Sequence, residues 1–151
     1  MATTQSGSFN TSSASSVGSS YPKYAKVSYN ATFNEDTLKW DVTWSATAQG
    51  GSTATKYTTV FSGSVTIKKS STTISSKSMS RQIQKATNDT VLLSGSFSVA
   101  PNETGDLTIS IVATFQFYTT GSGGTASKTQ TITLPQVAIS SLITLASPAI
   151  T

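Results

Sequence analysis

The stretch DTLKWDVTWSATA, residues 36–48, contains both tryptophans of the chain and decides the fold class. Residues two apart in a β-strand point to the same face. In this register five apolar side chains form one stripe: Leu38, Trp40, Val42, Trp44 and Ala46. Such a stripe is typical of a strand that buries one face, so the tryptophans are predicted to lie in a hydrophobic core. The alternative, a sugar-stacking platform, would place aromatic rings on the outward face beside polar groups.

Alternation of apolar and polar residues recurs along most of the chain, and no helical periodicity accompanies it. The predicted strands cover residues 27–33, 38–46, 57–67, one or two short pieces within 74–83, then 91–99, 107–117 and 129–135. Gly63 is predicted to mark a bulge or a close-packing point, and residues 119–128 (TTGSGGTASK) a glycine-rich hairpin loop. The pattern predicts an all-β fold, an antiparallel β-sandwich of seven to eight strands, Ig-like or jelly-roll.

The composition supports this fold class. Only 11% of the 151 residues are charged, whereas about 25% is usual in globular domains. Serine and threonine take their place, at roughly a third of the chain, and threonine favours extended backbone because it is β-branched. The length corresponds to one domain with a genuine core.

The predicted domain covers residues 21–137, between two segments of different character. Residues 1–20 are rich in Ser, Thr, Ala and Gly, and such a tract buries too little apolar surface to offset its ordering entropy. We therefore expect a flexible arm, with a short strand around SGSFN (residues 6–10) that orders on a neighbouring molecule. Residues 138–151 are expected to be a connector or a second arm. The tripeptide SGS starts at Ser6, Ser62 and Ser94. Its irregular spacing indicates a short sequence common to several strands rather than a structural repeat.

No catalytic, cofactor-binding or metal-binding residue is predicted. The chain has no His and no Cys, so the commonest general base and the thiolate metal ligands are missing. Of its six carboxylates, five fall in predicted turns, where acids solvate or cap a loop. Only Asp41 lies within a strand, on the face opposite the tryptophans. We expect a protein that is not an enzyme.

Five of the ten basic residues follow one another with no acid between them: Lys68, Lys69, Lys77, Arg81 and Lys85. They either contact a polyanion or a partner protein, or protect a sheet edge from unwanted pairing. The edge interpretation is favoured, because no aromatic residue interleaves with these charges as nucleic-acid binding would require.

Tyr118 is the outward aromatic candidate for glycan stacking, since it alternates against Phe115 and Phe117 on one predicted strand. Tyr21 and Tyr24, near the arm, are further candidates. A carbohydrate-binding or adhesion module would use these rings together with the outward Ser and Thr side chains.

Three motifs carry a family resemblance: W-x-V-x-W at residues 40–44, Y-x-x-V-F-x-G-x-V-T-I at 57–67 and T-I-T-L-P-Q-V at 131–137. With the Ser/Thr-rich sandwich pattern, over about residues 23–137, they resemble β-sandwich domains of tail-tip or minor structural proteins of tailed phages of Gram-positive bacteria. The resemblance implies assembly with other virion proteins and with further copies of the chain, and contact with a host cell-wall glycan. Its position in the virion (tail, fibre or capsid surface) stays open.

The N-terminus lacks both the basic start and the apolar segment of a secretory signal, and the apolar patches after residue 136 are too short to span a bilayer. We therefore expect no membrane contact, and synthesis in the host cytoplasm followed by incorporation into the virion. The leading hypothesis is a non-enzymatic virion structural protein that assembles through its sandwich and its extended termini.

Overall fold

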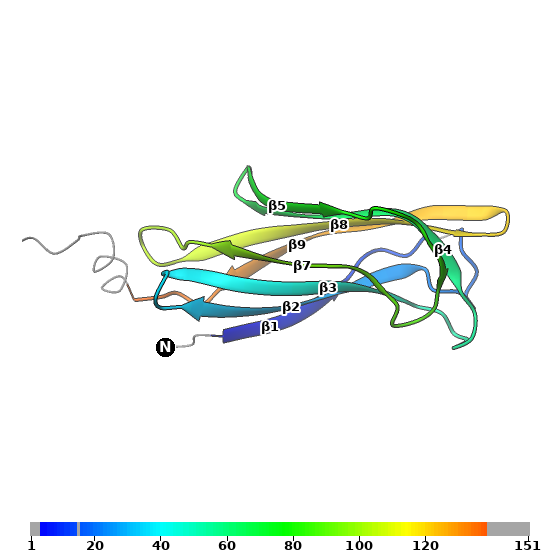
Figure 1. Cartoon of the computed structure of the whole chain (residues 1–151), viewed down its shortest axis with the longest axis horizontal. Helices are drawn as coiled ribbons and strands as arrows, with labels where there is room; N and C mark the ends of the chain where they lie inside the picture. The colour runs from blue at the N-terminus through cyan, green and yellow to red at the C-terminus, as the bar shows by residue number, and fades with distance from the viewer. Residues whose placement is uncertain (1–3, 15, 139–151) are drawn as a thin grey trace, which may run out of the picture.

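The computed structural model describes residues 4–14 and 16–138, and in these ranges the chain is all-β (Figure 1). Nine strands follow one another: β1 (Thr4–Asn10), β2 (Tyr24–Asn34), β3 (Lys39–Gln49), β4 (Thr58–Lys69), β5 (Thr72–Ser78), β6 (Ile83–Ala86), β7 (Val91–Val99), β8 (Leu107–Thr119) and β9 (Ser122–Leu134). One sheet has the order β1-β2-β3-β7. The other has the order β5-β4-β8-β9, with β6 paired to β4 beyond the end of β5. The predicted antiparallel sandwich is confirmed, with one strand more than the predicted range.

The tryptophan stripe faces the space between the sheets. Trp40 is fully buried and Trp44 is 4% exposed. The ring of Phe33, opposite Trp40 on β2, meets it edge to face with 5.5 Å between centroids. The facing sheet contributes the alternate residues of β8 from Leu107 to Phe117, all of them buried. The prediction that the tryptophans belong to the core is confirmed.

Glycines on the edge strands make room for the largest rings. Across the first sheet, Gly7, Tyr29, Trp44 and Gly95 lie opposite one another on β1, β2, β3 and β7. A Cβ added at Gly95 would come within 2.8 Å of Trp44 Cζ2, and one added at Gly7 within 2.7 Å of Tyr29 Cζ. Both rings therefore lie flat against the backbone of an edge strand.

In the second sheet a glycine also makes room for a ring: Gly63 on β4 lies opposite Phe115 on β8, directly under the Phe115 ring. Gly7, Gly63 and Gly95 are the central residues of the three SGS tripeptides. The tripeptide thus recurs because each copy places a glycine beside a buried or half-buried ring. The predicted close packing at Gly63 is confirmed, while the bulge lies just before it, between Val60 and Ser62.

The expectation of a flexible arm over residues 1–20 is wrong for its described part. Thr4–Asn10 forms the edge strand β1, which pairs along its whole length with β2 of the same chain. Ala14 and Val17, in the connection that follows, are buried in the core. The segment is ordered by its own sandwich rather than by a neighbour, so deleting it would uncover β2 and part of the core. Residues 1–3 and 139–151, including nearly all of the predicted connector, lie outside the described residues.

The predicted hairpin loop over residues 119–128 is also wrong. Thr119 pairs with Ser122, so only residues 120–121 form the turn, and Gly121 adopts a φ of 79° that favours glycine. The remaining small residues are part of β9. Gly124 is needed there because Ala14 packs against its backbone, where an added Cβ would meet the Ala14 Cβ at 3.3 Å.

Both open sides of the sandwich are closed by polar side chains. On one side, Lys69 Nζ donates to the carbonyl of Ala100 at 2.8 Å, and Lys77 Nζ donates to the carbonyl of Ser94 at 2.6 Å. On the other side, Gln5 Nε2 on β1 donates to the carbonyl of Thr133 on β9 at 3.2 Å. The bonds of Lys77 and Gln5 join edge strands of opposite sheets, and that of Lys69 ties the inner strand β4 to the end of β7. Such side-chain bonds occupy carbonyls at a sheet edge that an extra strand could use.

Candidate functional site

The surface feature that stands out is a group of exposed aromatic rings on the outer face of the second sheet. The described residues include four large exposed hydrophobic side chains, and three of them, Tyr57, Phe61 and Tyr118, are 43–48% exposed and adjoin one another where β4 begins and β8 ends. We call these three residues the aromatic surface. The fourth, Val91, begins β7 in the other sheet. Contiguous apolar area on a monomer surface commonly marks an interaction site.

A β-bulge brings Phe61 to this surface. In β4, Val60 and Val65 are both buried, although strict alternation would place them on opposite faces. The register shift between Val60 and Ser62 inserts one extra residue and resolves the conflict. Phe61 therefore points outward, where its ring meets Tyr118 edge to face at 6.3 Å.

The ring of Tyr118 is held in place from two sides. Its hydroxyl accepts a hydrogen bond from the backbone N–H of Gly121 in the hairpin turn, at 3.2 Å. Its Cδ2 lies over Gly123 on β9, where an added Cβ would approach to 3.1 Å. The ring therefore lies along the hairpin backbone and exposes its other face to solvent.

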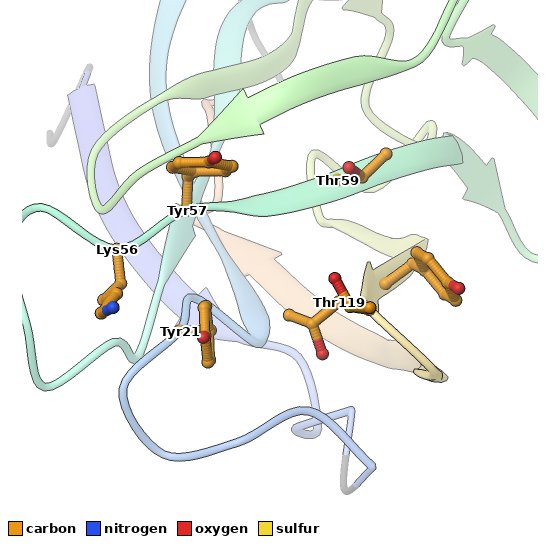
Figure 2. A pocket seen from close by; sticks show the side chains of 7 residues that line it. Tyr21, Lys56, Tyr57, Thr59 and Thr119 are labelled. Atoms are coloured by element: carbon orange, nitrogen blue, oxygen red, sulfur yellow. The ribbon is translucent and has the colours of Figure 1, made fainter.

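Two hollows adjoin at Tyr118 and Thr59, which line both. The first has a volume of about 390 Å³, and Figure 2 shows Tyr21, Lys56 and Tyr57 on one side of it with Thr119 opposite. The second has a volume of about 610 Å³ and is the shallower of the two. Its lining comprises Thr59, Phe61, Gln82, Gln84, Lys85 and Tyr118. Rings and hydrogen-bonding side chains thus alternate across one continuous area.

The first hollow is completed by the connection between β1 and β2, which carries Tyr21. Thr58, 1% exposed, donates its hydroxyl to the carbonyl of Pro22 at 2.6 Å. This buried bond joins the connection to the start of β4, next to Tyr57. Thr58 is therefore a polar residue in the core because its hydroxyl anchors the part of the connection that carries Tyr21, which we call the Tyr21 segment.

The charges around the aromatic surface are all positive. Lys56 lines the first hollow and Lys85 the second, and among the residues that the structure describes no carboxylate lines either. The Nζ of Lys85 lies 5.6 Å from the centroid of the Tyr57 ring, within the range of a cation–π contact. The arrangement suits a ligand that offers an apolar face, hydroxyl groups and a negative charge.

The predicted site residues separate in the structure. Tyr118 and Lys85 come together at the aromatic surface, with Tyr21 at its rim. Lys69 and Lys77 are turned toward the first sheet by their bonds to backbone carbonyls. Lys68 lies on β4 in the same hairpin as Lys69, and Arg81 lies in the link between β5 and β6. Tyr24 is half-buried, with its ring over Gly50.

Sequence reasoning missed Tyr57, Phe61, Lys56, Gln82 and Gln84 as parts of this site. The spacing of the apolar residues in β4 could have predicted that Phe61 is exposed. Val60, Val65 and Ile67 have incompatible spacing unless a bulge lies between the first two, and a bulge would have turned Phe61 outward.

The acidic residues do not form a site. Within residues 4–14 and 16–138, no three acidic side chains come together as metal ligands would. Asp41 lies on the outer face of β3, where Ser98 donates its hydroxyl to Oδ1 at 2.6 Å and Asn34 donates its amide to Oδ2 at 3.2 Å. These two bonds, and mainly the one from Ser98, hold the pKa of Asp41 below its ordinary value.

Residues 4–14 and 16–138 contain no helix long and apolar enough to cross a membrane.

The fold and this surface define the chain as an antiparallel β-sandwich that presents exposed aromatic rings at one end of a sheet. Comparison with protein-family models, curated proteins and solved structures finds no match. The function is therefore inferred from the geometry and from the sequence motifs.

Proposed function

We propose that this chain is a non-enzymatic structural protein of a phage virion, a tail, fibre or capsid-surface component built around one β-sandwich. The observation that carries the proposal is that the chain termini and the aromatic surface lie at opposite ends of the sandwich. The chain enters and leaves the described sandwich at one end, and the aromatic surface lies at the other (Figure 1).

The register of the strands fixes this separation. Gln5 on β1 is hydrogen-bonded to Thr133 near the end of β9, so the first and last strands meet at one end. Leu107 pairs with Leu134 at that end of β8, whereas Tyr118 pairs with Gly123 at the other. At about 3.3 Å per residue, the distance between the two pairs is roughly 35 Å. A module attached through its chain ends would therefore hold the aromatic surface away from the point of attachment.

The three motifs of the phage resemblance lie in three strands. The tryptophan motif belongs to β3, the long tyrosine motif covers most of β4 with its bulge, and the T-I-T-L-P-Q-V motif spans the end of β9 and the residues after it. Val137, its last residue, is buried, and its N–H donates to the carbonyl of Gly105 at 3.0 Å. The closing motif therefore belongs to the sandwich itself, and assembly contacts are expected beyond it and at the same end.

The proposal is tested by locating the chain in particles. Virions purified by density gradient from a culture that produces this chain would be labelled with gold-conjugated antibodies raised against the purified protein. We expect labels confined to one part of each particle (tail, fibre or capsid surface), and co-migration of the chain with the other virion proteins. Recovery of the chain only in the particle-free fraction would refute the virion role.

The second candidate function is a carbohydrate-binding or host-surface adhesion module on the same fold. The exposure of Tyr57, Phe61 and Tyr118 beside amide, hydroxyl and ammonium groups favours it. The two functions are compatible, since a virion component can also contact the host. A pull-down of the purified protein with isolated host cell walls tests the second, and failure to sediment with them would contradict it.

A further inference from the structure

We propose that the aromatic surface is a binding site for an acidic saccharide, with a sugar ring stacked on Tyr118 and Phe61 and its acidic group near Lys85 or Lys56. This inference rests on the second candidate function, which it deepens by naming the site and the ligand class. It does not depend on the virion role.

The apolar part of the site matches the less polar face of a sugar ring. A pyranose presents axial C–H groups on one face and hydroxyl groups around its rim, so it stacks on an aromatic ring while its rim stays available for hydrogen bonds. Tyr118 offers a ring face to solvent, and Phe61 stands at 75° to it, 6.3 Å away. The two rings form a corner into which a sugar fits, with amides and hydroxyls around it.

The polar part of the site surrounds the rings in the way that ligand orientation requires. Gln82 and Gln84 line the second hollow on the β6 side, and Thr59 lies between the hollows. The hydroxyl of Thr59 donates to the carbonyl of Gln84 at 3.2 Å and so joins β4 to β6 at this site. Amide side chains both donate and accept hydrogen bonds, which matches the paired character of sugar hydroxyls.

Charge decides between a neutral and an acidic sugar. Lys56 lines the first hollow and Lys85 the second, and no carboxylate of the described residues lines either hollow. An anion bound in either hollow would therefore meet one ammonium group and no carboxylate of the described residues. Complementary charge raises both selectivity and the rate of association.

The surface is also prepared for a ligand before binding. The Gly121 N–H and the Gly123 backbone fix the Tyr118 ring, and Lys85 lies against Tyr57. Side chains that are already ordered lose less entropy when a ligand binds. This order distinguishes the site from a group of exposed rings that merely escaped burial.

The test is an array of acidic and neutral saccharides, probed with the labelled full chain and with three variants. Tyr118→Ala removes the stacking ring and Lys85→Gln removes one charge. Val91→Ala, on the other sheet, is the matched control for loss of exposed apolar area. We expect the wild type to retain acidic saccharides, Tyr118→Ala to lower their affinity about tenfold, the effect of losing a contact of about 1.4 kcal/mol, and Val91→Ala to leave it unchanged. Lys85→Gln should reduce the preference for acidic over neutral members.

Two results would overturn the proposal: retention of no saccharide by a wild-type protein that circular dichroism shows to be folded, or equal retention by wild type and Tyr118→Ala. Tyr118→Phe keeps the ring and loses only the hydroxyl that accepts from Gly121, so it should restore most of the binding lost in Tyr118→Ala. A saturable complex with a purified virion protein that Tyr118→Ala abolishes, without any saccharide binding, would assign the surface to a protein partner instead. Because gold labelling of particles does not involve this surface, failure of the saccharide test leaves the virion test intact.

Discussion

Substituting Gly95 by alanine tests how the core accommodates its largest ring. Gly95 lies on the edge strand β7, directly opposite Trp44. An added Cβ would stand 2.8 Å from Trp44 Cζ2 and 2.9 Å from Cε2, whereas carbon atoms in contact prefer about 3.5–4.0 Å. Since Trp44 is only 4% exposed, its ring cannot turn away without disturbing β2 or the opposite sheet.

Two opposing effects set the size of the change in stability. Overpacking a well-filled core typically costs about 1–3 kcal/mol. Replacing glycine by alanine also restricts the unfolded chain, which stabilises the native state by about 0.4–1 kcal/mol. We therefore expect Gly95→Ala to lower the free energy of unfolding by about 1–2 kcal/mol.

Urea denaturation followed by tryptophan fluorescence measures this change. The control is Gly18→Ala, where the added Cβ would lie at an ordinary 3.4 Å from the Tyr21 ring, and where we expect a change within about 0.5 kcal/mol. A double-mutant cycle with Trp44→Phe isolates the clash, because the smaller ring should recover part of the loss. If Gly95→Ala did not change the stability, or if the effects of the two substitutions were additive, the conclusion that Gly95 makes room for the Trp44 ring would be wrong.

Three further predictions concern the core, the Tyr21 segment and acid stability. Trp40→Ala should lower the free energy of unfolding by about 3–5 kcal/mol, because the fully buried ring leaves a cavity; a loss below 1 kcal/mol in urea denaturation would contradict its core role. Thr58→Val should cost about 1–2 kcal/mol and speed amide exchange around Tyr21, since the bond to the Pro22 carbonyl is lost; unchanged exchange would contradict the proposed anchor. The pKa of Asp41 is lowered in the folded state, so its contribution to stability is present above its unfolded pKa of about 3.9 and is lost as the pH falls below that. Ser98→Ala should raise this pKa in an NMR titration, and an unchanged value would show that the Ser98 hydroxyl has no effect.

Much of the fold could be predicted because the core strands alternate without interruption. Every second residue is buried throughout β3 and, in β8, from Leu107 to Phe117, so one hydrophobic pattern defines both the strand and its inner face. The scarcity of charged residues and the lack of helical periodicity then leave few alternatives to a sandwich.

The two failures of the sequence interpretation have a common cause, which is the small size of the residues involved. Small residues (Ser, Thr, Gly and Ala) make up most of β1 and of the start of β9, a composition typical of loops and arms. Their order comes from pairing with β2 and β8 and from rings that pack over their glycines. Such tertiary stabilisation leaves no mark in the local pattern of apolar residues.

The candidate site was only partly predictable, for a related reason. Tyr118 is predictable because it is an aromatic residue on the outward face of a regularly alternating strand, next to the inward Phe117. Tyr57 and Phe61 depend on the bulge in β4, and Gln84 and Lys85 depend on the pairing of β6 with that same strand. A site assembled from β4, β6, β8 and the connection after β1 requires the sheet order, which the sequence alone does not specify.

The core and the surface use glycine in the same way, and this provides a test that separates stability from binding. Gly123 lies under Tyr118 as Gly95 lies under Trp44, and an added Cβ would come within 3.1 Å of the Tyr118 ring. Here the ring is 43% exposed and can move into solvent, so Gly123→Ala should cost less than about 1 kcal/mol of stability. The displaced ring would lose its alignment with Phe61 and with the Gly121 N–H. We therefore expect saccharide binding on the array to fall while urea denaturation changes little. Unchanged binding by Gly123→Ala would show that the fixed position of Tyr118 is irrelevant to recognition, even if the ring itself is required.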